Sequence, residues 1–245
     1  MGDRASIFVA LALAVTLTSA CALRAEAPPP PSDDATSHHD FADVEYWGSV
    51  FDDPARDAWQ KPKELVAALD IRRGSVVADL GAGTGYLSRR LSTAVGAEGT
   101  VLAVETEPNL VVHLRQRAER EKTSNVVPIL ASPADPRLPV GGVDLILIVD
   151  TYHHFDDRRT YLPALRRFLR PGGRIAIVDW QKRELPVGPE LDHKLAREQV
   201  LDEMQASGFT LAAEHTMLPY QYFLIFSPDP RLRLGSGEKG ESEAR

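Results

Sequence analysis

The chain has 245 residues, of which 43% are hydrophobic and 26% are charged, a composition that suits one globular domain with a sizeable core and polar tails. Its net charge of -7 excludes the basic surface that a nucleic-acid-binding protein presents. The single cysteine, Cys21, excludes a disulfide framework and a cysteine-ligated zinc site.

Residues 1–23 have the pattern of an export signal. No charge occurs from Ala5 to Leu23, and the apolar centre at 7–17 has the length of a signal-peptide core and is followed by small residues. The position of Cys21 directly after "TSA" resembles a bacterial lipoprotein signal. That resemblance implies that Cys21 is lipidated and tethers the chain to a membrane. We therefore expect an exported protein, either periplasmic or a membrane-anchored lipoprotein.

Two other fates of this segment stay open, which are cleavage by ordinary signal peptidase and retention as an uncleaved anchor. The uncharged stretch 5–23 is just long enough to span a bilayer. The start "MGDRAS" also fits the myristoylation pattern, but the apolar core behind it favours export. Next come a predicted proline-rich linker at 24–40, a globular domain at 41–228 and a disordered tail at 229–245.

The segment ahead of the first strand predicts one or two short helices, one of which begins at Pro62 and ends near Asp70. Aromatic residues give this segment an apolar face, and they are Phe41, Tyr46, Trp47, Phe51 and Trp59. Such a face either caps the sheet or forms a lid over a ligand, and both interpretations stay open.

From there the chain alternates between strand and helix patterns. Apolar runs predict strands at 76–80, 100–105, 125–130, 143–150 and 174–179, and helical spacing predicts helices at 84–94, 108–120, 158–169 and 195–207. The runs at 209–216 and 220–226 are separated only by a short turn, so they should pair as an antiparallel hairpin. The pattern predicts an α/β fold, with a doubly wound, mostly parallel seven-stranded sheet and this hairpin at its C-terminal edge.

A glycine-rich turn follows the first strand. Gly81, Gly83 and Gly85 are spaced G-x-G-x-G, and Tyr86 stands where the dinucleotide fingerprint requires glycine or alanine. A bulky ring at that position disfavours close packing of the following helix on the strand. A nicotinamide-dependent oxidoreductase is therefore the weakest of the functional hypotheses.

The stretch "DLGAGTG", from Asp79 to Gly85, resembles motif I of the class I S-adenosylmethionine-dependent methyltransferases. The resemblance implies a Rossmann-like methyltransferase fold in which Gly81, Gly83 and Gly85 face the methionine part and the ribose of the cofactor. Asp79 would hold the turn or bind the cofactor ammonium through a water. Glu105 ends the second strand, where a carboxylate accepts hydrogen bonds from both ribose hydroxyls.

Many members of that family also carry an aspartate just after the third strand, where it contacts the adenine amine. Here Ser132 stands at that place and Asp135 lies three residues further on. Either side chain can accept a hydrogen bond from the amine. The alternative for Asp135 is a turn residue between two prolines.

Catalytic candidates follow the fourth strand in "VDTYHHF", because ligands of open α/β sheets bind beyond the carboxyl ends of the strands. His153 or His154 can serve as a base near neutral pH, and Asp150 and Tyr152 are further candidates. Packing under the next helix is the alternative for either histidine. Four residues are candidates for lining an acceptor pocket, namely Trp180, His193, Tyr220 and Tyr222. The adjacent residues "HHD" at 38–40 make a poor metal site.

These features predict a methyltransferase that uses S-adenosyl-L-methionine and acts on an unidentified small-molecule acceptor, with no nucleic-acid partner. The alternative is a non-catalytic S-adenosylmethionine-binding or ligand-binding module of the cell envelope. It is motivated by the export signal, because S-adenosylmethionine is made in the cytoplasm.

Overall fold

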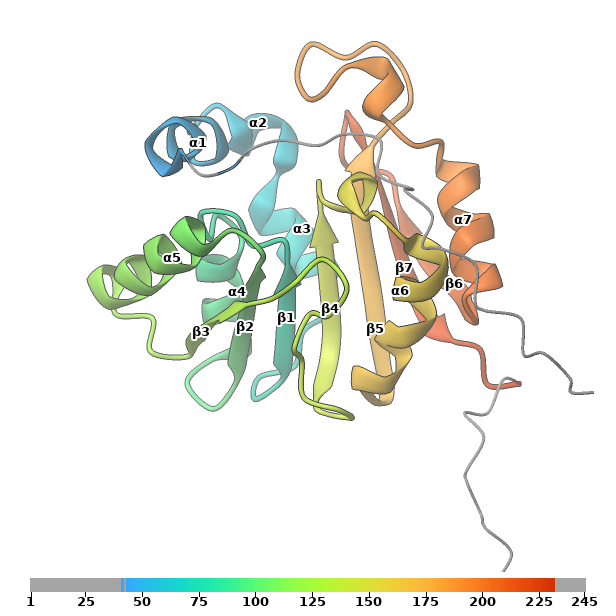
Figure 1. Cartoon of the computed structure of the whole chain (residues 1–245), viewed down its shortest axis with the longest axis horizontal. Coiled ribbons are helices and arrows are strands. Elements are labelled where there is room, and N and C mark those ends of the chain that lie inside the picture. The colour runs from blue at the N-terminus through green and yellow to red at the C-terminus, as the bar shows by residue number, and fades with distance from the viewer. Residues whose placement is uncertain (1–40, 42, 232–245) are drawn as a thin grey trace, which may run out of the picture. The chain divides into compact units, whose positions relative to one another are not determined.

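The computed structural model describes residue 41 and residues 43–231, all within the unit 31–245; the unit 1–30 lies outside the described residues. One seven-stranded sheet has the order β3-β2-β1-β4-β5-β7-β6 (Figure 1). Its strands are β1 (Val76–Leu80), β2 (Thr100–Glu105), β3 (Val126–Leu130), β4 (Val143–Val149), β5 (Leu169–Trp180), β6 (Phe209–His215) and β7 (Gln221–Pro228). Strands β1 to β5 pair in parallel, and β7 pairs antiparallel with both β5 and β6. The predicted fold class is confirmed.

Helices cover both faces of the sheet, because successive strand residues point to opposite sides. One buried cluster joins α3, α4 and α5 to residues such as Val77 and Leu145, and the other joins α6 and α7 to Ala78 and Ile146. The longer helices are α4 (Ser88–Val95), α5 (Pro108–Glu121), α6 (Arg158–Leu165) and α7 (Arg197–Ala206), and short 3-10 turns span Tyr152–His154, Arg166–Phe168 and Leu191–His193. Because the helices cover both faces, a ligand can reach the sheet only at the ends of its strands.

Two predicted boundaries were wrong. The helix expected at 158–169 ends at Leu165, and β5 already begins at Leu169, where it pairs with Val143 ahead of a register shift. Tertiary pairing thus extends the strand through "RPGG", a stretch whose local composition favours a turn. The helix expected from residue 84 begins only at Ser88, because residues 84–87 complete the glycine turn.

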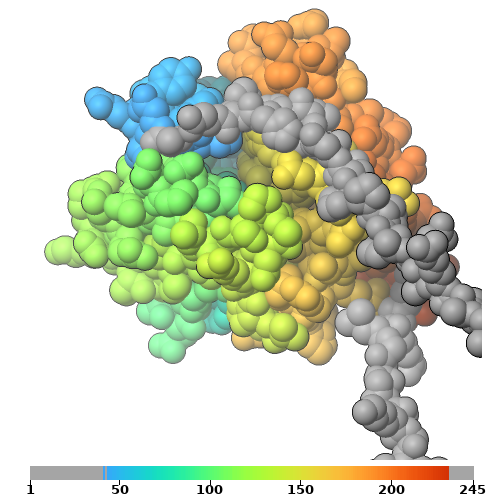
Figure 2. Space-filling view, in the orientation of Figure 1, coloured from blue at the N-terminus to red at the C-terminus, as the bar shows by residue number. Residues whose placement is uncertain are grey.

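Three short helices precede the sheet, where one or two were predicted: α1 (Val44–Phe51), α2 (Arg56–Gln60) and α3 (Pro62–Ala68). Lys61, with φ of 44°, turns the chain sharply between α2 and α3. In α3, Leu65 is fully buried against the sheet, so this helix caps the sheet as one interpretation predicted. Figure 2 shows α1 and α2 (blue) and the segment after β5 (orange) at the same end of the molecule, above the carboxyl ends of the parallel strands.

Asp229, the first residue of the predicted C-terminal tail, is bound to the domain. The Asp229 N–H donates to the Gly208 carbonyl at 2.9 Å, and the Asp229 carbonyl accepts from Arg166 at 3.0 Å, so this residue is fixed to the domain. The predicted signal, the linker and Cys21 lie outside the described residues. Among the residues that the structure describes, no helix is both long and apolar enough to cross a membrane.

Candidate functional site

The glycine turn joins β1 to α4 with three residues of positive φ, at 79° for Gly81, 56° for Gly83 and 87° for Gly85. A Cβ at Gly81 would lie 2.3 Å from the Thr151 Oγ1, and one at Gly85 would lie 2.9 Å from a Leu114 methyl carbon. Glycine is therefore required at these two positions by the protein's own packing. At Gly83 the nearest side chain is Phe51 of α1, at 3.3 Å from the Cβ position.

Glu105 organises this turn from the end of β2. Its Oε2 accepts from the Gly83 N–H at 2.9 Å, and its Oε1 accepts from the Thr106 N–H at 2.7 Å. The residue is only 8% exposed, and one Oε2 lone pair is still available to a ligand hydroxyl. A buried carboxylate held in this orientation suits the predicted contact with ribose.

Asp79 lies on the other side of the turn and is nearly completely buried. Burial, opposed by the hydrogen bond that Ser88 Oγ donates to its Oδ2 at 2.6 Å, raises the pKa of Asp79 to about 6. The nearby Glu105 carboxylate raises this pKa further, and Arg56 lowers it. The Ser88 bond gives Asp79 the turn-holding role that was one of its two predicted functions.

Asp150 directly follows β4, has a φ of 53° and is held by two side chains. Arg56 donates to its Oδ2 at 3.2 Å, and the Gln221 amide donates to its Oδ1 at 2.5 Å. Burial raises the pKa of Asp150 to about 7, although Arg56 acts in the opposite direction. Gln60 completes the network by donating to the Gln221 Oε1 at 2.8 Å. Asp150 is therefore a structural acceptor that joins β4 to α2 and β7.

His153 forms a buried pair with Asp179, near the carboxyl ends of β4 and β5. The His153 Nδ1 lies 2.9 and 3.0 Å from the two Asp179 oxygens, and both side chains are at most 3% exposed. Burial opposes charging of the ring, but the Asp179 carboxylate outweighs it, so the pKa of His153 is raised. With Nδ1 bound to the carboxylate, Nε2 is the nitrogen that can accept a proton.

The other two catalytic candidates are placed differently. Tyr152 is fully buried and donates to Glu203 Oε2 at 2.6 Å, and burial raises the pKa of its hydroxyl, which disfavours it as a base. The ring of His154 lies 4.1 Å from that of His153 and edge-on to Phe41 at 5.8 Å. His154 thus belongs to an aromatic cluster with the N-terminal segment.

Ser132 and Asp135 form a tight turn after β3. Each backbone N–H donates to the carbonyl of the other residue at 3.1 Å, and the Asp135 Oδ1 accepts from the Arg137 N–H at 2.9 Å. This is the turn role that was the alternative for Asp135. Their contact with adenine stays a prediction.

Helices α1 and α2 contact the glycine turn and the residues that follow it, and a lid over a ligand stays a prediction. Asp52 pairs with Arg117 at 2.8 Å, and Asp57 pairs with Arg90 at 3.0 Å and accepts from the Tyr86 hydroxyl. The Arg56 guanidinium lies 4.3 Å from the centre of the Tyr86 ring. The sequence provided no signal for Arg56, because a single arginine in a polar helix is common.

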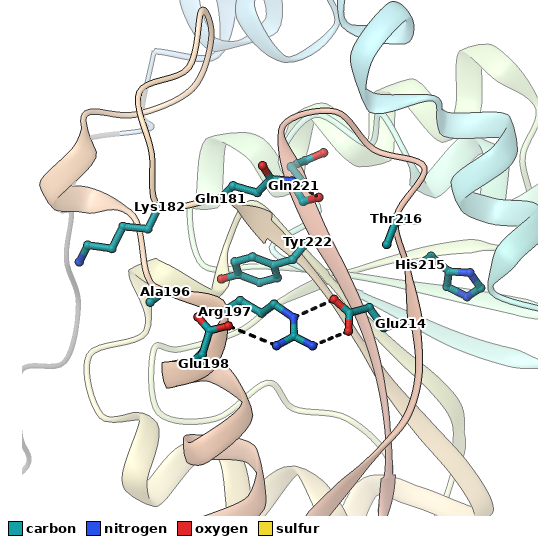
Figure 3. Close-up of a pocket in the computed structure, with 10 residues that line it drawn as sticks. All are labelled: Gln181, Lys182, Ala196, Arg197, Glu198, Glu214, His215, Thr216, Gln221 and Tyr222. Carbon is teal, nitrogen blue, oxygen red and sulfur yellow. Dashed lines mark hydrogen bonds and ion pairs between the residues drawn. The ribbon is translucent and has the colours of Figure 1, made fainter.

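Of the four residues predicted to line an acceptor pocket, one lines a cavity. Trp180 is 6% exposed, and its ring lies 5.1 Å from Trp59, which lies 6.3 Å from Tyr220. His193 lies on the 3-10 turn before α7. Only Tyr222 of these four lines the pocket of Figure 3. Residues 38–40 lie outside the described residues, within which no cluster of metal-binding side chains occurs.

The site residues fit S-adenosylmethionine. Asp79 and Glu105 bring two buried carboxyl groups to the ends of β1 and β2, and the partly buried Asp150 directly follows β4. These carboxyl groups suit the cationic groups and the ribose of that molecule. The Thr84 hydroxyl in the glycine turn is buried without a hydrogen-bond partner among the described residues. An orphaned donor at this position is consistent with a ligand contact. The fold and the site thus define a protein with a nucleoside-type cofactor site at the switch point of a parallel sheet.

Comparison with known proteins specifies the family. Residues 77–173 match the model of a methyltransferase domain. An O-methyltransferase of Aspergillus nomiae is 30% identical over 57% of this chain and 62% of its own length, and a ubiquinone/menaquinone biosynthesis C-methyltransferase of Marinomonas is 27% identical over 50% and 49%. The chain spans about half the length of the curated relatives it matches.

Among solved structures, a SAM-dependent methyltransferase from Aquifex aeolicus has the same fold, with a TM-score of 0.72, 23% identity and coverage of 77% of this chain and 98% of the other. The domain match, the curated relatives and the shared fold together support a class I S-adenosylmethionine-dependent methyltransferase domain in this chain.

Proposed function

We propose that the protein transfers a methyl group from S-adenosylmethionine to a hydroxyl oxygen of a small molecule. The observation that carries the proposal is the His153–Asp179 pair. His153 lies just after β4, and β4 pairs with β1, the strand that leads into the glycine turn. A hydroxyl acceptor must lose its proton, and a histidine held by a carboxylate is suited to receive it. Two of the relatives are named for O-methylation, the Aspergillus protein and a 27-O-demethylrifamycin SV methyltransferase of Amycolatopsis mediterranei.

Different residues of the protein have different roles in this reaction. Glu105 and the glycine turn hold the cofactor, which when bound supplies a methyl carbon whose bond to sulfur breaks as the acceptor oxygen bonds to it. His153 takes the hydroxyl proton at Nε2, and Asp179 keeps the ring oriented and stabilises its charged form. Positioning contributes much of the expected rate, because the methyl group is already activated.

Transfer of a labelled methyl group tests this function directly. The full chain is incubated with methyl-labelled S-adenosylmethionine and a panel of phenols, aliphatic alcohols, amines and thiols. We expect label in a hydroxyl compound, at a rate that rises with pH as His153 loses its proton. Label found only in amines or thiols would contradict the assignment of an oxygen acceptor. Binding of S-adenosylhomocysteine without transfer to any compound would instead favour the non-catalytic alternative, for which the described residues provide no specific support.

We also propose that the protein is exported and anchored through lipidated Cys21, on the support of the pattern in residues 1–23. Fractionation and mass spectrometry of the mature N-terminus should find a lipid-modified Cys21 in the membrane fraction. Replacing Cys21 by alanine should move the protein to the soluble fraction. An intact Met1 in the cytosol would contradict export, and an unmodified new N-terminus would indicate ordinary signal peptidase.

A further inference from the structure

A pocket of about 370 Å³ lies beyond the end of β5, next to the start of β7 (Figure 3). Its walls come from the segment after β5, the start of α7 and the β6–β7 hairpin. The volume falls at the lower end of the range for small-molecule sites. The pocket is thus large enough for a small ring compound.

Tyr222 forms one wall of this pocket and carries an unused hydrogen-bonding group. The residue is 5% exposed, and its hydroxyl has no hydrogen-bond partner among the described residues. Figure 3 shows the hydroxyl directed toward the start of α7, where Ala196 and Arg197 lie. Buried hydroxyls in native proteins nearly always have a partner. A ligand oxygen in the pocket would provide one after a small adjustment of the side chains that now cover this hydroxyl.

The charges on the pocket wall already compensate each other. Arg197 donates to Glu214 Oε1 at 2.7 Å and to Glu198 Oε1 at 3.3 Å, as the dashed lines of Figure 3 mark. The Lys182 side chain also lines the pocket, but Figure 3 shows its ammonium pointing away from Tyr222. A charged ligand would therefore find no unpaired partner beside the Tyr222 hydroxyl, which favours a neutral molecule.

Two residues that line the pocket adjoin the candidate catalytic groups. Tyr222 is the direct cross-strand neighbour of Asp179, which holds His153. The adjacent Gln221 lines the pocket and donates to Asp150 at the end of β4. A molecule bound here would thus contact Tyr222 and Gln221, which adjoin Asp179 and Asp150.

We propose that this pocket binds the methyl acceptor, a neutral small molecule that presents a hydroxyl or carbonyl oxygen to the Tyr222 hydroxyl. The inference rests on the proposed function, because it assigns the pocket to the substrate of that reaction. It makes Tyr222 the residue that selects an oxygen-bearing acceptor and leaves cofactor binding to the glycine turn.

Three probes of similar size and different charge test the pocket, namely phenol, benzoate and benzylamine. Each is titrated into the full chain, and nuclear magnetic resonance follows the side-chain amides of Gln181 and Gln221, which line the pocket. We expect phenol to bind at least fivefold more tightly than benzoate or benzylamine. Tyr222→Phe should weaken phenol binding at least fivefold. The matched control Tyr161→Phe removes another buried tyrosine hydroxyl, on α6, and should leave binding unchanged.

A filling variant provides a second measurement. Ala196 lines the pocket, so Ala196→Phe should abolish phenol binding, whereas Ala212→Phe on the exposed face of β6 should not. Tighter binding of a charged probe, or phenol binding that Tyr222→Phe leaves unchanged, would overturn the proposal. Parallel calorimetry with S-adenosylhomocysteine distinguishes failure of the pocket assignment from failure of the proposed function. Normal cofactor binding without phenol binding refutes only the pocket assignment, and loss of cofactor binding in the unmodified chain refutes the proposed function.

Discussion

Replacing Gly83 by valine should weaken binding of S-adenosylhomocysteine at least 100-fold, as measured by calorimetry on the full chain. Gly83 has a φ of 56°, which a β-branched residue does not adopt without strain, and its N–H orients the Glu105 carboxylate. A side chain there would also meet Phe51 and stand on the surface that the cofactor is expected to contact. A larger residue therefore affects both the turn and the ribose-binding carboxylate.

Gly141→Val is the matched control for backbone strain. Gly141 has a nearly equal φ of 60°, and a Cβ there would meet no atom within 4 Å. It precedes β4 at the opposite end of the sheet from the glycine turn. We expect both variants to lose stability by about 1–2 kcal/mol in thermal or denaturant unfolding, which is the ordinary penalty of this conformation. Equal affinity for S-adenosylhomocysteine in the two variants would contradict the assignment of Gly83 to the cofactor site.

Replacing His153 by glutamine should lower the rate of methyl transfer by about 100-fold to 10,000-fold, the range that general-base catalysis supplies. Its neighbour provides the matched control, because His154→Gln removes an adjacent imidazole that packs against Phe41. The stability of each variant is measured in the same buffer, so a folding defect is recognised. A large loss in His154→Gln together with normal activity in His153→Gln would move the base to His154.

Asp179→Asn tests how the carboxylate acts on His153, and its first measurement, the pKa of His153, does not require a known acceptor. Removing the carboxylate should lower the pKa of His153, which nuclear magnetic resonance of the imidazole protons measures directly. The rate of methyl transfer should then begin to rise at a lower pH, because His153 loses its proton at a lower pH. The maximum rate at high pH should fall. An unchanged pKa of His153 in Asp179→Asn would show that the carboxylate does not stabilise the charged ring.

The same pair contributes to stability in a pH-dependent way. Because the pKa of His153 is raised in the folded protein, the pair's stabilisation is complete below the unfolded value of about 6.5 and is lost as the pH rises through the folded value. The pair is thus strongest when His153 carries the proton, which is the state that follows proton transfer from the acceptor.

The strand positions and the glycine turn were determined by local sequence. Apolar runs such as 76–80 and 100–105 coincide with β1 and β2, because strands buried on both faces have no alternative that satisfies their side chains. The short turn before residue 220 likewise fixed the antiparallel hairpin. The family resemblance came from the same stretch, where glycine spacing and an acidic residue stand within seven residues, from Asp79 to Gly85.

Only the tertiary structure decided how the polar groups meet. Asp179 was predicted as part of a strand, and its pairing with His153 depends on β4 and β5 lying side by side. Arg56 contacts Asp150 across 94 residues of chain, and no local pattern indicates such a pairing. The Tyr222 hydroxyl has no hydrogen-bond partner within residues 43–231, and this follows in the same way from packing between the β6–β7 hairpin and α7. Sequence periodicity specifies which face of an element is buried, whereas the partner of a buried polar group depends on elements brought together from distant parts of the chain.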